Sequence, residues 1–309
     1  GTEGTSFQFM VTENNWLGRG INLASELNLS QDKVSGTLAV SNPNYNYSGN
    51  AVSGSLEVSS TDRAAATGFK SSRTGFELGT TFEQYENIFI SPNLNISYED
   101  IEVDSTASSS IKKMEGNFFT TDLSYGITLD KRDQKFKPTE GYRAKFFQSL
   151  PIIQDSSSIS NGLDISAYHD FSEDLIGSLK FYAKSIHGLD DDVRLTNRLY
   201  IPSRKLRGFN TYKVGPKDGG DFIGGNYMST LGAEAQLPNL LPESYRTDIS
   251  LFLDTGNVWK VDYSDSIDDS NKIRSSKNLI HQISYKMNIK IRNLNKTTSR
   301  FRKKPFGKD

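Results

Sequence analysis

Apolar and polar residues alternate with a period of two along most of the chain. In the run 20–30, one face carries Ile21, Leu23, Leu27 and Leu29, and the positions between them are mainly polar. Successive side chains of a β-strand point to opposite faces, so this alternation is typical of a strand with one apolar and one polar face. The sequence therefore predicts an all-β fold.

Turn residues divide the chain into about thirteen such runs before residue 259. Their approximate bounds are 5–16, 20–30, 33–42, 50–62, 73–84, 87–103, 118–131, 140–152, 160–172, 175–188, 196–203, 226–237 and 245–259. A further alternating run, 283–291, is a candidate fourteenth strand. We expect about 13–14 strands, with long polar connectors between some of them.

The length of the runs separates two fold classes. A soluble β-sandwich has strands of about five or six residues, whereas membrane strands need about 9–11 residues. Several runs reach ten or more residues, and aromatic residues such as Trp16, Tyr45, Tyr47 and Trp259 lie near run ends, as in an interfacial girdle. Both features favour an antiparallel transmembrane β-barrel over a sandwich.

Composition narrows the function classes. Hydrophobic residues make up 35% of the chain and the mean hydropathy is −0.54. No stretch approaches the ~20 apolar residues of a membrane helix. The chain has no cysteine and three histidines, and no Gly-x-Ser-x-Gly turn accompanies them. We therefore expect no catalytic residues, no cofactor and no metal site.

One glycine-rich connector, 204–226, holds the candidate functional residues. It contains the motif Leu206, Arg207, Gly208 and Phe209. Two acids follow at Glu234 and Asp254, each on the polar face of its predicted strand. A guanidinium can bond two carboxylates in a fork geometry, and its burial requires such partners. The connector is predicted to fold into the lumen, with these carboxylates anchoring Arg207.

At these residues the chain resembles the BamA family of outer-membrane barrel-assembly factors. Further matches are Asn15-Trp16-Leu17-Gly18-Arg19-Gly20, Ser41-Asn42-Pro43, Leu129-Asp130-Lys131-Arg132-Asp133, Pro138-Thr139-Glu140-Gly141, Gly225-Asn226 and Asp254-Thr255-Gly256-Asn257-Val258-Trp259. The motifs follow the family order over about residues 5–276. Singly they are weak, and together they are specific.

The resemblance implies a sixteen-stranded barrel in the outer membrane of Gram-negative type, which folds and inserts other outer-membrane proteins and is not an enzyme. Its partners would be unfolded outer-membrane protein clients, assembly-complex lipoproteins and outer-membrane lipids. A client strand would pair with the first strand at Phe7, Gln8, Phe9, Met10 and Val11. Gly256 and Trp259 would belong to a turn and girdle motif.

Three alternatives remain beside this interpretation. Arg207 is either part of the mechanism or only a structural clamp that holds a plug. The protein is either an assembly factor, a two-partner secretion transporter or a passive outer-membrane pore. No nucleic-acid partner is expected, because the basic residues lack interleaved aromatic residues on which bases could stack.

The end of the chain differs from the rest. From residue 277 onward there are ten Lys and Arg residues and one acid, Asp309. The family pattern stops after Ser276 at the same point. We therefore expect a barrel domain at 1–276 and an aberrant basic tail at 277–309. A truncation or frame shift after Ser276 is the simplest explanation, ahead of an evolved alternative end, and it would leave the barrel incomplete.

Overall fold

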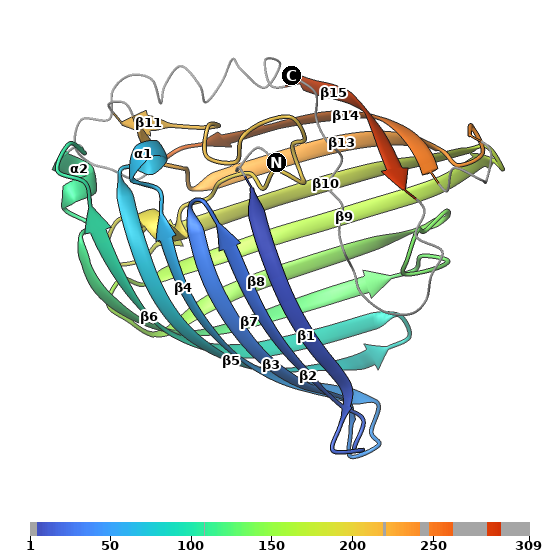
Figure 1. Cartoon of the computed structure of the whole chain (residues 1–309), viewed down its shortest axis with the longest axis horizontal. Helices are drawn as coiled ribbons and strands as arrows, with labels where there is room; N and C mark the ends of the chain where they lie inside the picture. The colour runs from blue at the N-terminus through green and yellow to red at the C-terminus, as the bar shows by residue number, and fades with distance from the viewer. Residues whose placement is uncertain (1–4, 108, 219–220, 242–246, 262–282, 292–309) are drawn as a thin grey trace.

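A computed structural model describes residues 5–107, 109–218, 221–241, 247–261 and 283–291. Its main element is one antiparallel sheet of thirteen strands in the order β1-β2-β3-β4-β5-β6-β7-β8-β9-β10-β13-β14-β15 (Figure 1). Successive strands of this sheet are neighbours, as in a meander, and β11 and β12 form a separate two-stranded sheet between β10 and β13 in the chain. Among the described residues, no helix is both long and apolar enough to cross a membrane.

The strands are long, as the alternation predicts. Their bounds are β1 Ser6–Trp16, β2 Ile21–Ser30, β3 Lys33–Tyr45, β4 Asn50–Asp62, β5 Phe69–Tyr85, β6 Ile88–Val103, β7 Gly116–Asp130, β8 Gly141–Gln154, β9 Ser158–Ser172, β10 Leu175–Gly188, β13 Tyr227–Leu237, β14 Thr247–Trp259 and β15 Ile283–Ile291. Short elements lie between them: α1 Ala64–Thr67, α2 Ser109–Lys112, a 3-10 turn Leu195–Asn197, β11 Lys217–Asp218 and β12 Asp221–Phe222.

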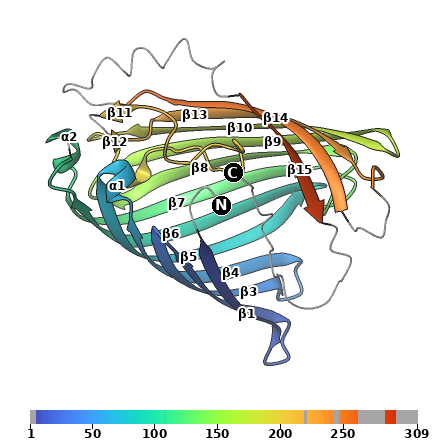
Figure 2. The same cartoon turned by 45° about the horizontal axis from the view of Figure 1, so that its top comes forward.

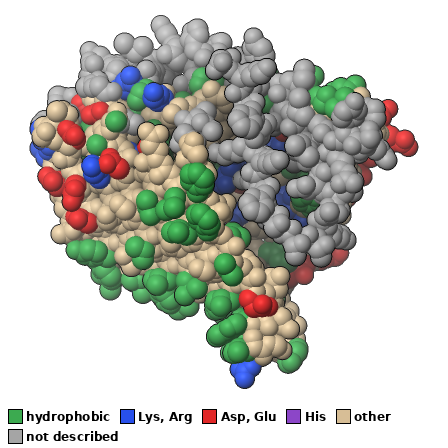
Figure 3. Space-filling view, in the orientation of Figure 1, with side chains coloured by type: hydrophobic (Ala, Val, Ile, Leu, Met, Phe, Trp, Pro, Cys, Tyr) green, Lys and Arg blue, Asp and Glu red, His purple; other side chains and the backbone are tan. Residues whose placement is uncertain are grey.

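The sheet curls around an interior (Figures 1 and 2). Large apolar side chains such as Leu38, Leu56, Phe76, Leu179 and Leu251 are exposed. In Figure 3 hydrophobic side chains gather over the outer wall, and charged ones gather beside α1 and α2. An apolar outer band with charge at its end is typical of a barrel that faces lipid. The all-β barrel architecture predicted from the alternation is confirmed.

The two ends of the sheet differ in the length of their connectors. Segments 63–68, 104–115 and 189–226 lie at one end, called here the loop end. The opposite end, called the turn end, has mostly tight connectors such as 17–20, 46–49, 86–87 and 173–174, together with the longer segment 131–140. Membrane barrels of this kind have short periplasmic turns and longer extracellular loops. The loop end and the turn end therefore correspond to the two sides of the membrane.

One predicted strand is wrong. Residues 196–203 do not join the sheet. Instead they contain the end of the 3-10 turn and an isolated bridge between Leu199 and Gly225. The alternation arises because Leu199 and Ile201 are buried against the inner side of the sheet wall, at 4% and 1% exposure. The connector consequently runs from 189 to 226 rather than from 204.

The order of the sheet ends at β1 and β15, and no pairing between these two strands occurs among the described residues. The candidate fourteenth run is present as β15, which pairs with β14. Because 196–203 is not a strand, the count is thirteen. Apart from β15, the predicted basic tail and the boundary at Ser276 lie outside the described residues.

Candidate functional site

The connector 189–226 lies against the inner side of the sheet near the loop end (Figure 1). Two apolar clusters join it to the wall. The first consists of Ile186, Val193, Leu199, Ile201, Leu206, Val214, Met228 and Val258. The second consists of Phe69, Ile101, Ala107, Ile111, Leu195 and Ile223. These clusters bury apolar side chains on the barrel interior, so burial as well as charge holds the connector there.

Arg207 lies between the two predicted carboxylates. Its Nε donates to Asp254 Oδ2 at 2.6 Å, and its Nη2 donates to Asp254 Oδ1 at 2.7 Å. Nη1 donates to Glu234 Oε2 at 3.0 Å, and the Arg207 backbone N–H donates to Asp254 Oδ2 at 3.1 Å. The guanidinium therefore makes a two-point contact with one carboxylate and a single contact with the other, the geometry for which its rigid fork is suited.

The register of three strands explains why these groups meet. Lys180 of β10 lies opposite Gly232 of β13, which lies opposite Asp254 of β14. Glu234 is two residues further along β13 and therefore shares its face. A Cβ atom at Gly232 would lie 2.8 Å from Asp254 Oδ1, closer than real contacts allow. Glycine at 232 thus leaves room for the Asp254 carboxylate.

Two cations, Lys180 and Arg207, contact the carboxylates of the site. Lys180 Nζ donates to Glu234 Oε2 at 2.9 Å, the same oxygen that accepts from Arg207. The Arg207 guanidinium also lies 3.5 Å from the ring centroid of Phe252, in a cation–π contact. The side chain of Asp254 is only 3% exposed, so its charge depends on Arg207 for compensation.

Burial alone would lower the pKa of the Arg207 guanidinium. Hydrogen bonding to Asp254 and the charges of Glu234 and Asp254 outweigh this effect and hold the pKa above its ordinary value. The guanidinium is therefore charged at neutral pH. The site is an ion-pair network centred on this charge.

The neighbours of Arg207 in the motif have packing roles. Leu206 is 1% exposed in the first apolar cluster, and Phe209 packs against that cluster. Gly208 has a φ of 91°. This conformation favours glycine, because in other residues the Cβ atom would clash with the backbone. Leu206 and Phe209 thus pack on the same apolar cluster, next to the ion pairs of Arg207.

Gly256 lies within β14 rather than in a turn, which corrects the predicted turn motif. A Cβ atom at Gly256 would lie 2.8 Å from Thr230 Cγ2 and 3.3 Å from Ile201 Cδ1. Glycine is needed there because the adjacent strand β13 and Ile201 of the connector both lie close to this position. Trp259 ends β14 and stacks on Tyr227, with ring centroids 5.9 Å apart.

The predicted client edge is β1, an edge strand of the sheet. Phe7, Gln8, Phe9, Met10 and Val11 belong to β1, whose residues are all exposed. The side chain of Gln8 donates to Glu26 on β2. Among the described residues, the other edge of β1 pairs with no strand.

Three contacts of the lumen were not predicted. Lys180 pairs with Glu234, and Lys205 Nζ donates to both carboxylate oxygens of Asp164 at 2.9 Å. At the turn end, Lys137 Nζ lies 2.7 Å from Asp248 Oδ2 on β14. Lys180 and Asp164 could have been found from the alternation, since both occupy polar faces of long strands. Nothing in the local sequence points from Lys137 to a residue 111 positions away.

These features define a membrane β-barrel whose interior holds a connector anchored by an arginine. Comparison with known proteins gives the family. The model of the Omp85 superfamily domain matches residues 15–293, so the chain belongs to the Omp85 superfamily. Its fold and relatives assign it to an outer membrane.

Two curated relatives are informative. The chain is 27% identical over 218 residues to the outer membrane protein assembly factor BamA of Neorickettsia risticii (strain Illinois), an alignment that covers 67% of this chain and 29% of the relative. It is 25% identical over 173 residues to the human sorting and assembly machinery component 50 homolog, covering 52% and 36%. The chain thus spans about a third of the length of these relatives.

A solved structure shares the fold. The crystal structure of BamA from Haemophilus ducreyi lacking POTRA domains 1–3 superposes with a TM-score of 0.73 at 19% sequence identity. The match covers 84% of this chain and 56% of that structure. The BamA-type barrel expected from the sequence motifs is therefore confirmed at the level of fold.

Proposed function

We propose that this chain is the barrel part of an outer-membrane protein assembly factor of Gram-negative type, which folds unfolded barrel proteins and inserts them into the membrane. The observation that carries the proposal is the combination of an anchored connector inside the barrel with an edge of β1 that pairs with no strand among the described residues. The names of the BamA and sorting-machinery relatives support the same activity.

The edge of β1 is suited to bind another strand. An unpaired strand edge offers a row of N–H and C=O groups, which an incoming strand can bond by β-augmentation. Phe7, Phe9 and Val11 are 62%, 60% and 74% exposed, so their side chains are available to a strand laid alongside. We propose that the C-terminal strand of a client pairs here.

The anchored connector supports an assembly role over a passive pore. A pore needs an open aqueous path, whereas connector 189–226 packs two apolar clusters against the inner wall. We propose that the Arg207 contacts keep the connector in place while the β1 edge is in use. Lipoprotein partners at the periplasmic side and outer-membrane lipids around the apolar band complete the proposed setting.

The proposal is tested by adding the chain, refolded in liposomes, to an unfolded outer-membrane barrel and measuring how fast the client becomes protease-resistant. Successive backbone N–H groups of a strand point to opposite edges. Proline at Phe7, Phe9 and Val11 and proline at Gln8 and Met10 therefore remove donors from different edges. One of these two sets removes donors from the free edge of β1 and leaves β1–β2 pairing and barrel stability intact. We expect that set to abolish client insertion.

Two results would contradict the proposal. One is insertion at the same rate with and without the chain. The other is unchanged insertion when the free edge of β1 carries prolines and the barrel remains folded. A stable ionic conductance in planar bilayers without any insertion activity would instead support the pore or transporter alternative.

A further inference from the structure

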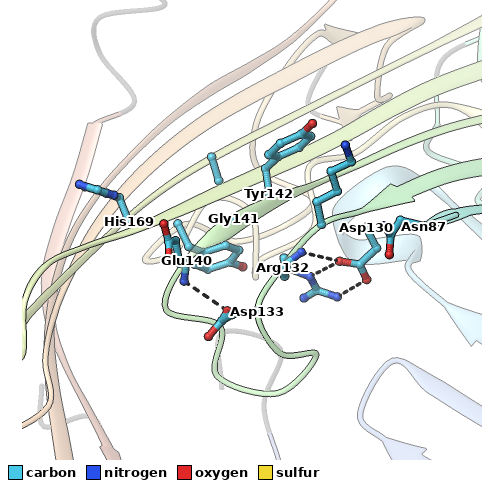
Figure 4. A pocket seen from close by; sticks show the side chains of 11 residues that line it. Asn87, Asp130, Arg132, Asp133, Glu140, Gly141, Tyr142 and His169 are labelled. Carbon is cyan, nitrogen blue, oxygen red and sulfur yellow. Dashed lines mark hydrogen bonds and ion pairs between the residues drawn. The ribbon is translucent and has the colours of Figure 1, made fainter.

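A cluster of potential metal ligands lies at the turn end, remote from the Arg207 site. It consists of Glu140, directly before β8, and His169 and Asp170 near the end of β9. Figure 4 shows Glu140 and His169 close together beside the segment 131–140. One ligand atom from each of the three side chains lies within 4.8 Å of the other two.

The backbone places Glu140 beside His169. In the β8–β9 ladder Gly141 pairs with Tyr168, so Glu140 and His169 are the next neighbours across the two strands. Asp133 holds the segment in front of β8: its Oδ1 accepts from the backbone N–H groups of Thr139 at 3.0 Å and Glu140 at 3.2 Å. The Asp133 N–H in turn donates to the Glu140 carbonyl at 3.2 Å. Glu140 is therefore presented from a structured segment.

The three ligand groups are uncommitted. Among the described residues, the side chains of Glu140, His169 and Asp170 make no hydrogen bond or ion pair. The imidazole lies against the ring of Phe171, edge to face, with ring centroids 4.7 Å apart. Two carboxylates that converge without a Lys or Arg partner repel each other, and a bound cation would offset this repulsion.

We propose that Glu140, His169 and Asp170 bind a divalent transition-metal ion of the zinc class. One imidazole nitrogen and two carboxylate oxygens match the three-ligand sites of Zn²⁺, in which water completes the coordination. The imidazole selects against Mg²⁺ and Ca²⁺, which prefer oxygen ligands. With metal–ligand bonds of about 2.0–2.2 Å, tetrahedral ligands lie about 3.4 Å apart. Rotation of three exposed side chains can close the separation from 4.8 Å.

The proposed metal site is open to water, and a bound ion connects two strands. Glu140 and His169 line a cavity of about 730 Å³ together with Asn87, Asp130 and Tyr142, so an ion can enter from the aqueous side. Once bound, the ion joins the start of β8 to the end of β9 at the rim of the turn end. It therefore cross-links two adjacent strands at the end of the sheet opposite most of the anchored connector.

The test is calorimetric titration of the metal-free, refolded full chain in detergent with Zn²⁺. Absorption of bound Co²⁺ serves as a second readout, which reports ligand geometry. The background is low because the chain contains no cysteine and three histidines. We expect one Zn²⁺ per chain, no competition from Mg²⁺, and an affinity at least about tenfold lower in His169→Gln, the scale on which even indirect changes to a metal site act.

His187→Gln is the matched control, because His187 is also exposed but lies at the other end of the sheet beside Tyr227. It should bind Zn²⁺ like the unaltered chain. Glu140→Gln and Asp170→Asn provide independent variants, since all three ligand residues are exposed and their replacement leaves the wall intact. Equal affinity in the unaltered chain and in all three variants, equal loss in His187→Gln, or no stoichiometric binding would overturn the proposal.

Discussion

Two cations reach the inner face of β14, and they differ in how they are held. Near the loop end Arg207 makes a two-point contact with Asp254, a single hydrogen bond to Glu234 and a cation–π contact with Phe252. At the turn end Lys137 makes a single contact with Asp248. The Asp254 side chain is 3% exposed, whereas those of Lys137 and Asp248 are 33% and 15% exposed. The first contact is therefore an internal anchor and the second a partly hydrated tether.

This difference follows from physical chemistry. Removing one partner of a buried pair leaves an uncompensated charge, while an exposed pair is screened by water and salt. An arginine fork also fixes direction, whereas a lysine ammonium behaves as a point charge on a flexible stem. The comparison implies that the connector 189–226 is fixed to β14 and that the segment 131–140 can leave it at little cost.

The largest effect is expected for Asp254→Asn, which leaves Arg207 without its two-point partner. Unfolding in urea should show a loss of about 3–5 kcal/mol in stability. Trypsin should also cleave the connector faster after Lys205 and Arg207. Asp248→Asn on the same face of β14 is the matched control, and an equal loss in both variants would remove the distinction between anchor and tether.

A smaller effect is expected for Glu234→Gln. Arg207 keeps its contacts with Asp254, and the amide still accepts one hydrogen bond. The loss should be about 1.5–3 kcal/mol, the range for a hydrogen bond to a charged group. Urea unfolding measures it, and a loss as large as that of Asp254→Asn would show that the two carboxylates contribute equally.

Gly232→Ala tests the room left for the Asp254 carboxylate. The new methyl group would lie 2.8 Å from Asp254 Oδ1 and displace it from Arg207, at a cost of about 1–3 kcal/mol in urea unfolding. Gly36 in β3 has no neighbouring atom within 4 Å of an added Cβ, so Gly36→Ala is the control. Similar stabilities of the two variants would contradict the steric argument.

Lys137→Ala should have the smallest effect. Because the pair with Asp248 is partly exposed, we expect a loss of at most about 1 kcal/mol, and less at high salt. Urea unfolding at two salt concentrations measures both. A loss of stability that exceeds about 3 kcal/mol and does not depend on salt would show that Lys137 behaves like the buried ion pair of Arg207.

Much of the fold could be predicted from the alternation of residue types. The bounds of β4, β10 and β15 agree with the alternating runs 50–62, 175–188 and 283–291. Alternation fails at 196–203, because Leu199 and Ile201 are apolar for a different reason: they pack on the inner side of the wall. A period of two shows which side chains of a segment are buried. It does not identify the part of the molecule against which they pack.

The candidate site was also predictable only in part. Arg207, Glu234 and Asp254 are found from strand faces and from the need of a buried guanidinium for anions, and the structure brings them together. Gly256, which the family resemblance places in a turn and girdle motif, lies within β14, where neighbouring atoms approach it closely. The contact between Lys137 and Asp248 depends on the path of a turn across the lumen, which no local pattern encodes.

The most direct test of the anchored connector exchanges its two charges. Arg207→Asp and Asp254→Arg should each destabilise the barrel, because each leaves two like charges together. The double variant restores opposite charges and should recover part of the loss, with a coupling free energy of at least about 1 kcal/mol in urea unfolding. A double variant as unstable as the sum of the two single variants would show that Arg207 and Asp254 do not hold the connector in the lumen.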